Sequence, residues 1–350
     1  MKKFDSFGEL LLAVRAAALM PGRRDPRLET RGVGSASGAS EAVPSDGGFL
    51  VGEDFVRPLV ERMYLTGAIL IRCMEFPISN KSNGISYPQF DESSRRNGSR
   101  MGGLQAYWAN EADTVTASKP KFLRSKLTAK KLIGLVYVTD ELFEDAAALE
   151  IFVSMGLSKE LAFRLEDAII NGDGSGKPQG ILGSGAMLTV PKVPGQAAAT
   201  VVAENVVQCW QQMWAPSRRS MVWLAHPDAE AQCVGLTAAV GTGGSTIPLY
   251  VATTDPDNQP FNLMLGRPVI PMEQTQVPGT PGDIIAADFS RYALAMREAR
   301  ADVSMHIAFL TDEAAFRVTL RVDGQPIDAR PITPFNGTNQ VSPFVCIAQR

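Results

Sequence analysis

Hydrophobic residues recur at helical spacing in one long segment, from Ala146 to Ile170. The pattern places several apolar side chains on a single face: Phe152, Met155, Ala162, Leu165 and Ile169. This spacing predicts an amphipathic helix. At about 1.5 Å per residue the helix would be more than roughly 30 Å long, enough to form the spine of a flat molecule. The Gly-rich residues 171–174 end it.

Strict alternation of apolar and polar residues appears in two other segments. Residues 121–130 place Leu123, Leu127 and Ala129 on one face, and the apolar run 132–138 follows directly. Residues 316–323 alternate in the same way and end at a turn signal, Asp323-Gly324. Alternation over this length predicts half-buried strands. We expect the apolar run to continue the first strand, and the later strand to return to the same sheet.

Between these segments, residues 179–301 are expected to form a separate α/β lobe. A helix is predicted around Val206–Trp214, and a shorter one begins at His226-Pro227-Asp228. Short apolar runs predict buried strands, and they lie at 221–225, 263–265, 269–270, 284–287 and 292–296. Before the lobe, a short helix is expected around 54–64 and a strand at 68–76.

Two segments lack the residues needed to build a core. After a predicted capped helix that starts at Ser6, residues 22–48 contain almost no large apolar side chains, so we expect an extended arm. Residues 76–120 are polar, rich in turn signals such as Asn83-Gly84, and too long for a plain loop in a compact domain. A long projecting β-hairpin, which gains its contacts from other subunits, explains them better.

Composition limits the functional classes. The chain has 350 residues, which suggests two or more lobes, and a formal net charge of −3, which argues against a dedicated nucleic-acid binder. Its four cysteines are far apart, which excludes a zinc ribbon or a CxxC redox site and favours reduced thiols made in a cytoplasm. The apolar run at 10–14 is too short for a secretory signal or a membrane span.

Candidate chemistry is sparse. Residues 172–177 look like a phosphate-binding loop, but Asn171 and Pro178 replace two required residues and the loop follows a helix. The two histidines, His226 and His306, have no acidic or cysteine partners at ligand spacing. We therefore predict no enzyme activity, no cofactor and no metal site.

Arginines form the remaining candidates. Arg95, Arg96 and Arg100 lie in the predicted hairpin, and Arg317 and Arg321 lie on the polar face of the last alternating strand. The hairpin arginines could contact nucleic acid, but a solvated or subunit-contacting role is favoured because no aromatic residues are interleaved. For the strand arginines, ion pairs between subunits, contact with packaged DNA and plain solvation all stay open.

Several short motifs, in order, resemble the phage capsid family with the Hong Kong 97 fold. The segment 171–182 is similar to the family's Gly-Asp-Gly turn and Pro-x-Gly-Ile/Leu sequence at the end of the spine helix. Further resemblances lie at 47–51, 265–269, 282–292 and 316–324. Each motif is weak alone, but their order over residues 47–330 is specific.

This resemblance implies an α+β capsid fold with an extended N-terminal arm, a long hairpin called the E-loop, a P-domain with the spine helix, and an axial A-domain. The ranges expected for these parts are 1–47 (arm), 48–75 (P-domain helix and strand), 76–120 (E-loop), 121–178 (P-domain strand and spine helix), 179–301 (A-domain) and 302–350 (return strand and C-terminus).

The resemblance also implies a function. Family members form hexamers and pentamers that close into an icosahedral shell around double-stranded DNA, with portal, scaffolding and sometimes decoration proteins as partners. We therefore expect a major capsid protein, found in the virion and assembled in the host cytoplasm. Gly172, Asp173 and Gly174 would then form a hinge between spine helix and axial lobe. An encapsulin, a bacterial compartment shell of the same fold, is the closest alternative.

Two departures from the family pattern change the expectation. Many family precursors carry an N-terminal scaffolding region that a protease removes, whereas only residues 1–46 precede the folded part here. We expect a mature-length product. Some members also join subunits by a lysine–asparagine bond, but residues 91–110 contain no lysine. Although Asn336 and Asn339 are possible acceptors, we expect no covalent cross-link.

Overall fold

The computed structural model describes most of the chain after residue 47 and isolated positions before it. The described residues are 9, 13, 16, 25, 28, 48–50, 53–79, 82–90, 92, 94–96, 100–110, 114, 117–139, 146–240, 245–253, 260–308 and 313–350. Apart from the isolated positions, the predicted capped helix and N-terminal arm lie outside them.

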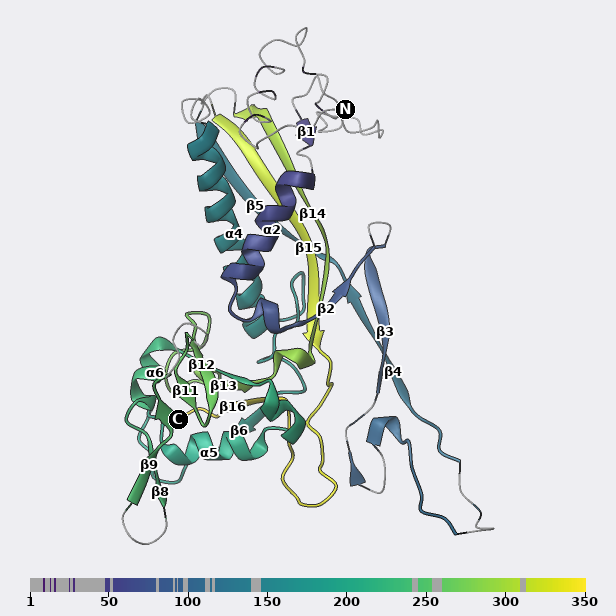
Figure 1. Cartoon of the computed structure of the whole chain (residues 1–350), viewed down its shortest axis with the longest axis vertical. Coiled ribbons are helices and arrows are strands. Elements are labelled where there is room, and N and C mark those ends of the chain that lie inside the picture. The colour runs from purple at the N-terminus through teal and green to yellow at the C-terminus, as the bar shows by residue number, and fades with distance from the viewer. Residues whose placement is uncertain are drawn as a thin grey trace.

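An elongated five-stranded sheet with helices on one face forms the upper body of the molecule (Figure 1). Its strands run in the order β1-β14-β15-β5, and β2 pairs with β14 on the side. Their bounds are β1 Gly48–Leu50, β2 Met74–Pro77, β5 Lys130–Thr139, β14 Tyr292–Ala308 and β15 Glu313–Pro326. The long antiparallel pairing of β14 with β15 and of β15 with β5 forms its centre. The predicted return of the late strand is confirmed for the sheet that holds residues 130–139, whereas residues 122–128 belong to another sheet.

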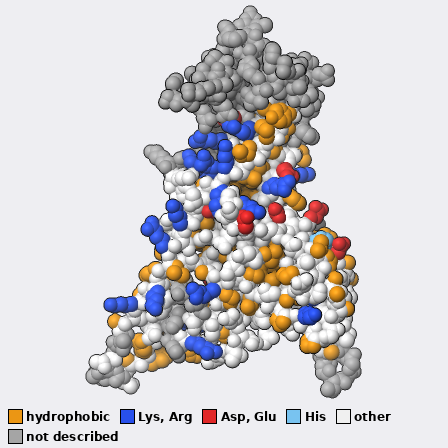
Figure 2. Space-filling model, turned by 180° about the vertical axis from the view of Figure 1, so that it is seen from behind, with side chains coloured by type: hydrophobic (Ala, Val, Ile, Leu, Met, Phe, Trp, Pro, Cys, Tyr) orange, Lys and Arg blue, Asp and Glu red, His pale blue; other side chains and the backbone are white. Residues whose placement is uncertain are grey.

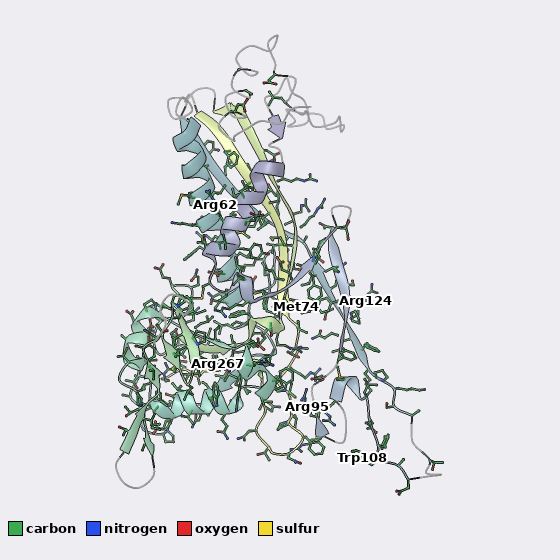
Figure 3. The ribbon with its side chains drawn as sticks, viewed as in Figure 1. Arg62, Met74, Arg95, Trp108, Arg124 and Arg267 are labelled. Carbon is green, nitrogen blue, oxygen red and sulfur yellow. The ribbon has the colours of Figure 1, made fainter. Side chains whose placement is uncertain are left out.

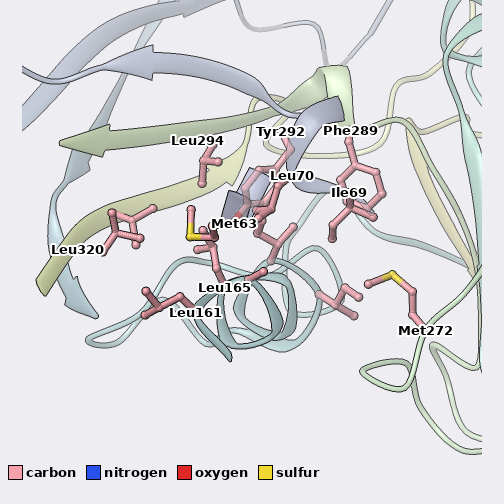
Figure 4. Close-up of a cluster of buried hydrophobic side chains, with 14 of the residues drawn as sticks. Met63, Ile69, Leu70, Leu161, Leu165, Met272, Phe289, Tyr292, Leu294 and Leu320 are labelled. Atoms are coloured by element: carbon pink, nitrogen blue, oxygen red, sulfur yellow. The ribbon is translucent and has the colours of Figure 1, made fainter. Parts of the chain in front are cut away.

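Helix α4 (Ala146–Asn171) and helix α2 (Glu53–Thr66) pack on each other and cover the same face of this sheet. Leu161 and Leu165 of α4 contribute to a core that includes Met63, Leu294 and Leu320 (Figure 4). Burying each such side chain contributes about 1.5–3 kcal/mol. The amphipathic helix predicted from the sequence is therefore confirmed.

One residue assigned to the buried face of this helix is half exposed. Met155 is 46% exposed, whereas Leu165 and Ile169 are fully buried. At 100° per residue, Leu161 and Leu165 mark the centre of the buried face and Met155 falls at its edge. The sequence could not show which part of a broad apolar face the sheet would cover.

The second body is a lobe around a seven-stranded sheet of order β10-β11-β12-β7-β13-β16-β6. The strands are β6 Leu188–Val190, β7 Val222–Ala225, β10 Tyr250–Val251, β11 Leu263–Met264, β12 Arg267–Pro271, β13 Ile284–Ala287 and β16 Phe344–Ile347. Helices α5 (Ala203–Gln212) and α6 (Pro227–Cys233) and the small pair β8 (Thr237–Val240) and β9 (Ser245–Pro248) complete it.

Its central strands read as continuous apolar runs because both faces of the sheet are buried. In β7, Trp223 points into the core of the lobe, and Leu224 points into the core shared with α4. Sheets covered on both faces select such runs rather than alternation. His226 is the N-cap of α6, and its side chain accepts a hydrogen bond from the Asp228 backbone N–H, as the predicted helix start requires.

The hairpin consists of strands β3 (Gly84–Phe90) and β4 (Phe122–Thr128) and projects to one side (Figure 1). Among the loop residues described, Arg100–Gly102 form a short 3-10 turn, η5. At the base of the hairpin, Leu127 and Ala129 pack on Ala293 and Ala295 of β14 in a small core. The strand predicted over 121–138 is therefore two strands in two sheets, broken at Ala129.

Three expected boundaries differ in the structure. The hairpin's second strand lies at 122–128, beyond the expected range 76–120. Within the expected lobe 179–301, the last strand that joins the lobe's sheet is β13, which ends at Ala287. The next strand, β14, begins at Tyr292 and belongs to the five-stranded sheet. The C-terminal segment returns to the lobe, where β16 pairs with β13 and β6. Residues 68–76 also form a 3-10 turn, η3 (Leu70–Arg72), before the strand β2.

The C-terminal return is closed by a buried ion pair. The side chains of Arg350 and Asp283 are fully buried and in contact. Asp283 also accepts hydrogen bonds from the backbone N–H groups of Gly279 and Ile284. A buried pair needs such additional hydrogen bonds to offset desolvation.

A buried carboxylate links helix α4 to the segment that follows helix α2. Glu166 of α4 accepts hydrogen bonds from the backbone of residues 68–70, including Ile69 N at 2.8 Å. Burial raises the pKa of Glu166 above its ordinary value of 4.5, although these hydrogen bonds act in the opposite direction.

This shift predicts a pH dependence of stability. Because the folded pKa is raised, the folded state holds the proton longer than the unfolded state, so the contribution of Glu166 falls as pH rises from about 4.5 through the folded pKa. Glu166→Gln keeps an acceptor oxygen and removes the titration. We expect the free energy of unfolding of the variant, relative to wild type, to improve steadily over this pH window in urea titrations. Glu160→Gln, at an exposed position of the same helix, is the control for removal of one carboxylate. A Glu166→Gln profile that runs parallel to that of wild type would contradict the assignment.

Candidate functional site

The predicted hinge residues lie in a tight turn between α4 and the lobe. After Asn171 the chain turns back so that the Gly180 N–H donates to the Gly172 carbonyl at 2.8 Å. Gly174 has a positive φ of 79°, a conformation that favours glycine. Asp173 is exposed, and a hydrogen bond from the Ser175 N–H to its carboxylate holds the pKa of Asp173 below its ordinary value.

Gly172 is required by close packing rather than by an unusual backbone angle. A Cβ atom on this residue would lie 2.1 Å from the Pro178 carbonyl oxygen and 2.4 Å from that of Ala168. Such distances are far inside contact range, so any side chain would separate the two limbs of the turn. Gly174 has no neighbour closer than 3.6 Å to its Cβ position. The two glycines thus have different roles, and Gly172 is held firmly.

One lysine ties this turn to the sheet. Lys130 Nζ donates to the carbonyl oxygens of Gly174 and Lys177, each at 2.8 Å, and pairs with the Asp323 carboxylate at 3.0 Å. The other carboxylate oxygen of Asp323 accepts the Thr128 N–H of the hairpin at 2.7 Å. The junction thus joins turn, sheet and hairpin. Sequence reasoning missed both residues, and the one available signal was a lysine pair interrupting an apolar pattern at 130–131.

Two of the three hairpin arginines are engaged within the chain. Arg95 pairs with Glu92 at 2.9 Å and lies over the ring of Trp214. Arg96 donates to the Gly337 carbonyl at 2.8 Å. Arg100 is exposed, and its backbone carbonyl accepts two bonds from the following turn. The structure therefore brings Arg95 and Arg96 against the segment after β15, and it leaves Arg100 in solvent.

The strand arginines lie on the face of the five-stranded sheet opposite the helices, which we call the open face. Arg317 pairs with Asp302 of β14 at 2.8 Å. Arg321 donates to the Asn83 side chain at 3.0 Å. Both contacts are internal to the subunit. Seen from behind, lysine and arginine side chains spread along the hairpin side of the molecule, with hydrophobic side chains between them (Figure 2).

Hydrophobic side chains also remain uncovered on the open face. Ile133, Leu135 and Tyr137 of β5 are 47%, 50% and 52% exposed. Their neighbours Leu132 and Val136 point to the opposite face and pack against the core. The apolar run that was predicted as a continuous strand is thus buried on one side only, and β5 is the last strand of its sheet.

The described residues contain little reactive chemistry. No group of three or more His, Cys, Asp or Glu side chains in this part of the chain is placed to hold a metal ion. Burial raises the pKa of the Cys209 thiol and that of the Cys346 thiol, which disfavours the nucleophilic thiolate. None of the described helices is long and apolar enough to cross a membrane. The features that stand out are surfaces rather than reactive groups.

The Lys130 junction supports a stability prediction. Lys130→Met leaves the Asp323 carboxylate and two carbonyl oxygens short of a donor, so the free energy of unfolding should fall by about 1–3 kcal/mol. Lys131→Met, at the exposed neighbouring position, is the matched control and should stay within about 0.5 kcal/mol of wild type. Urea denaturation of the isolated subunit measures both, and equal effects would show that the junction contributes nothing specific.

Comparison with known proteins identifies the family to which the chain is similar. The profile of the Phage capsid family matches residues 47–337. Among solved structures, the capsid of a native GTA particle is 15% identical over 95% of this chain and 97% of its own, with a TM-score of 0.55. For the capsid of the empty GTA particle the values are 14%, 95% and 98%, with a TM-score of 0.58.

A third structure, from Microbacterium phage Oxtober96, is 14% identical over 81% of this chain and 90% of its own, with a TM-score of 0.51. No curated protein sequence matches at a significant level. At these identities the structural likeness shows the fold, and the expected α+β capsid fold is confirmed. Since the family profile covers most of the sequence, the chain belongs to the phage capsid family.

Proposed function

We propose that this chain is the major capsid protein of a tailed phage, and that its copies form hexamers and pentamers of an icosahedral shell around double-stranded DNA. Its role is assembly and not catalysis. Family membership supports the capsid assignment. The single observation that carries the assembly proposal is the amount of hydrophobic surface that one subunit leaves uncovered.

Part of this surface lies on the hairpin. Phe90 and Phe122, whose rings are 5.1 Å apart near its outer end, are 39% and 57% exposed. In the loop beyond them, Tyr107 is 48% exposed and Trp108 is fully exposed. Large exposed apolar side chains grouped on one projecting element favour an interaction site in a soluble protein. A projecting two-stranded hairpin is also only marginally stable alone, so neighbouring subunits would stabilise it.

Ring formation follows from where these surfaces lie. The hairpin projects from one side of the body, and the lobe lies on the other side (Figure 1). Contacts between two different surfaces of identical copies are heterologous, and they close into rings when the rotation permits. Hexamers and pentamers are two such closures of one subunit. We assign the hairpin to the E-loop, the seven-stranded lobe to the axial A-domain, and residues 1–47 to an arm that contacts neighbouring subunits.

The proposed relation to DNA is enclosure without sequence recognition. The net charge of −3 gives little attraction for a polyanion. Arg95, Arg96, Arg317 and Arg321 each contact groups of their own chain, which reduces what they offer to phosphate. Portal, scaffolding and decoration proteins are the proposed partners. The chain would be assembled in the host cytoplasm and reside in the virion.

The turn at Gly172–Gly174 keeps its proposed role as the joint at which lobe and spine shift during shell maturation. Because Gly172 packs tightly between the backbones of Ala168 and Pro178, the two chain segments of the turn would move together rather than unwind. Gly174, with space around it and a positive φ, is then the better candidate for the moving residue.

Assembly can be tested with one hairpin variant. We expect purified wild-type chain to form closed shells with hexamers and pentamers, seen by sedimentation and cryo-electron microscopy. Replacing residues 103–110 with a Gly/Ser segment of equal length removes the exposed apolar side chains of the loop, and should leave at least about tenfold more protein in the unassembled fraction. Ile247→Ser, which removes an exposed apolar side chain from β9 in the lobe, is the control and should assemble normally.

A wild-type chain that stays monomeric under all assembly conditions would contradict the proposal. Native particles from infected cells should contain DNA and a portal. Small shells filled with cargo protein would indicate a bacterial compartment instead.

A further inference from the structure

A groove lies between the outer part of β3 and the two bodies of the subunit. Its volume is about 400 Å³. Strand β2, the outer part of β3, the turn η5 and the start of the 3-10 turn η6 (Ala215–Arg219) surround it. Its main lining residues are Met74, Phe76, Phe90, Met101, Trp214 and Arg291.

One wall of the groove is built around the Trp214 ring. The guanidinium carbon of Arg95 lies 4.9 Å from the ring centroid, and that of Arg291 lies 5.4 Å from it. Asp328 holds the Arg291 guanidinium with two hydrogen bonds, at 2.8 and 2.6 Å. Glu92 holds Arg95 at 2.9 Å. Because both arginines are fixed by carboxylates, the wall is rigid before anything binds.

The rest of the groove is apolar and open. Phe76 stacks on Tyr87 with ring centroids 5.0 Å apart, which sets the floor. Met74, Phe90 and Met101 line the sides and are 46%, 39% and 50% exposed. Methionine sulfur and aromatic edges favour contact with another aromatic ring. The groove therefore suits a large aromatic side chain with a hydrogen-bond donor.

The same chain presents such a side chain elsewhere. Residues 103–110 carry no charge, and within them Leu104, Tyr107 and Trp108 are 46%, 48% and 105% exposed. Trp108 lies on the loop at the lower end of the hairpin, away from Met74 (Figure 3). A fully exposed tryptophan on an uncharged loop is typical of an interface anchor.

We propose that Trp108 of one copy inserts into this groove on the neighbouring copy, and that this contact is repeated around each ring. The inference rests on the proposed assembly function and specifies one of its contacts. The indole ring would pack between the methionines and Phe90. Its N–H would donate to the Glu92 carboxylate, which has accepting capacity beyond its bonds to Arg95 and the Met101 N–H. Anchor and groove are different surfaces, as a head-to-tail ring requires.

Disulfide trapping between two preparations tests this contact. One preparation carries Trp108→Cys, and a second, distinguished in mass by an affinity tag, carries Phe90→Cys or Met74→Cys. After mixed assembly and mild oxidation, we expect a heterotypic dimer on non-reducing gels that reductant removes. Ile247→Cys in the second preparation is the control and should give none. Wild-type chain measures the background from native cysteines, three of which are buried.

Assembly measurements provide the second readout. Trp108→Ala should raise the protein concentration needed for assembly at least about tenfold, as expected for an interface anchor. Trp108→Phe keeps an aromatic ring but loses the indole N–H, and its assembly concentration should fall between those of wild type and Trp108→Ala. Since Trp108 touches little of its own chain, folding of the variants should match wild type by circular dichroism.

The outcomes separate the two proposals. If wild-type chain forms shells but Trp108→Ala assembles at the same concentration and no heterotypic dimer appears, the groove contact is wrong and the assembly function stands. A dimer formed with Ile247→Cys instead would also overturn the contact. If wild-type chain forms no shell, both proposals fail.

Discussion

The subunit depends on one partly buried junction at the point where its parts meet. Asp323 of β15 pairs with Lys130 of β5 and accepts the Thr128 N–H from the end of the hairpin. Lys130 in turn holds the carbonyl oxygens of the turn that leaves α4. Sheet, hairpin, spine helix and lobe are therefore oriented by a single network. In such a partly buried network a member left without its partner is costly, because the low local dielectric solvates it poorly.

Around this junction the cores are unevenly distributed. The spine helix and the lobe share one large core, and the lobe's sheet is buried on both faces. The hairpin, in contrast, has its described buried core at its base, and the open face of the five-stranded sheet leaves Ile133, Leu135 and Tyr137 partly in solvent. The subunit therefore combines a well-packed body with a hairpin and a sheet face whose hydrophobic side chains remain exposed. Binding that covers those edges would add stability that the isolated subunit lacks.

Local patterns in the sequence determined a large part of this architecture. The helix α4 follows from apolar spacing over 146–170, and β15 follows from alternation over 316–323. The short apolar runs of the lobe, such as β7, follow from burial on both faces. These elements were predictable because their signal is periodic and is carried by neighbouring residues. The turn at 172–176 was likewise visible, since glycine-rich sequence ends helices.

Only the tertiary structure decided which segments pair and which side chains find partners. The alternating pattern of 121–130 does not show the break at Ala129, because the break arises where β4 joins the hairpin and β5 joins another sheet. The return of β16 to the lobe depends on pairing with β13, far away in sequence. Arg95, Arg96 and Lys130 gain their roles from contacts over long sequence separations. Sequence determined the elements through local periodicity, whereas non-local contacts, which periodicity does not encode, determined the junction, the groove and the exposed edges.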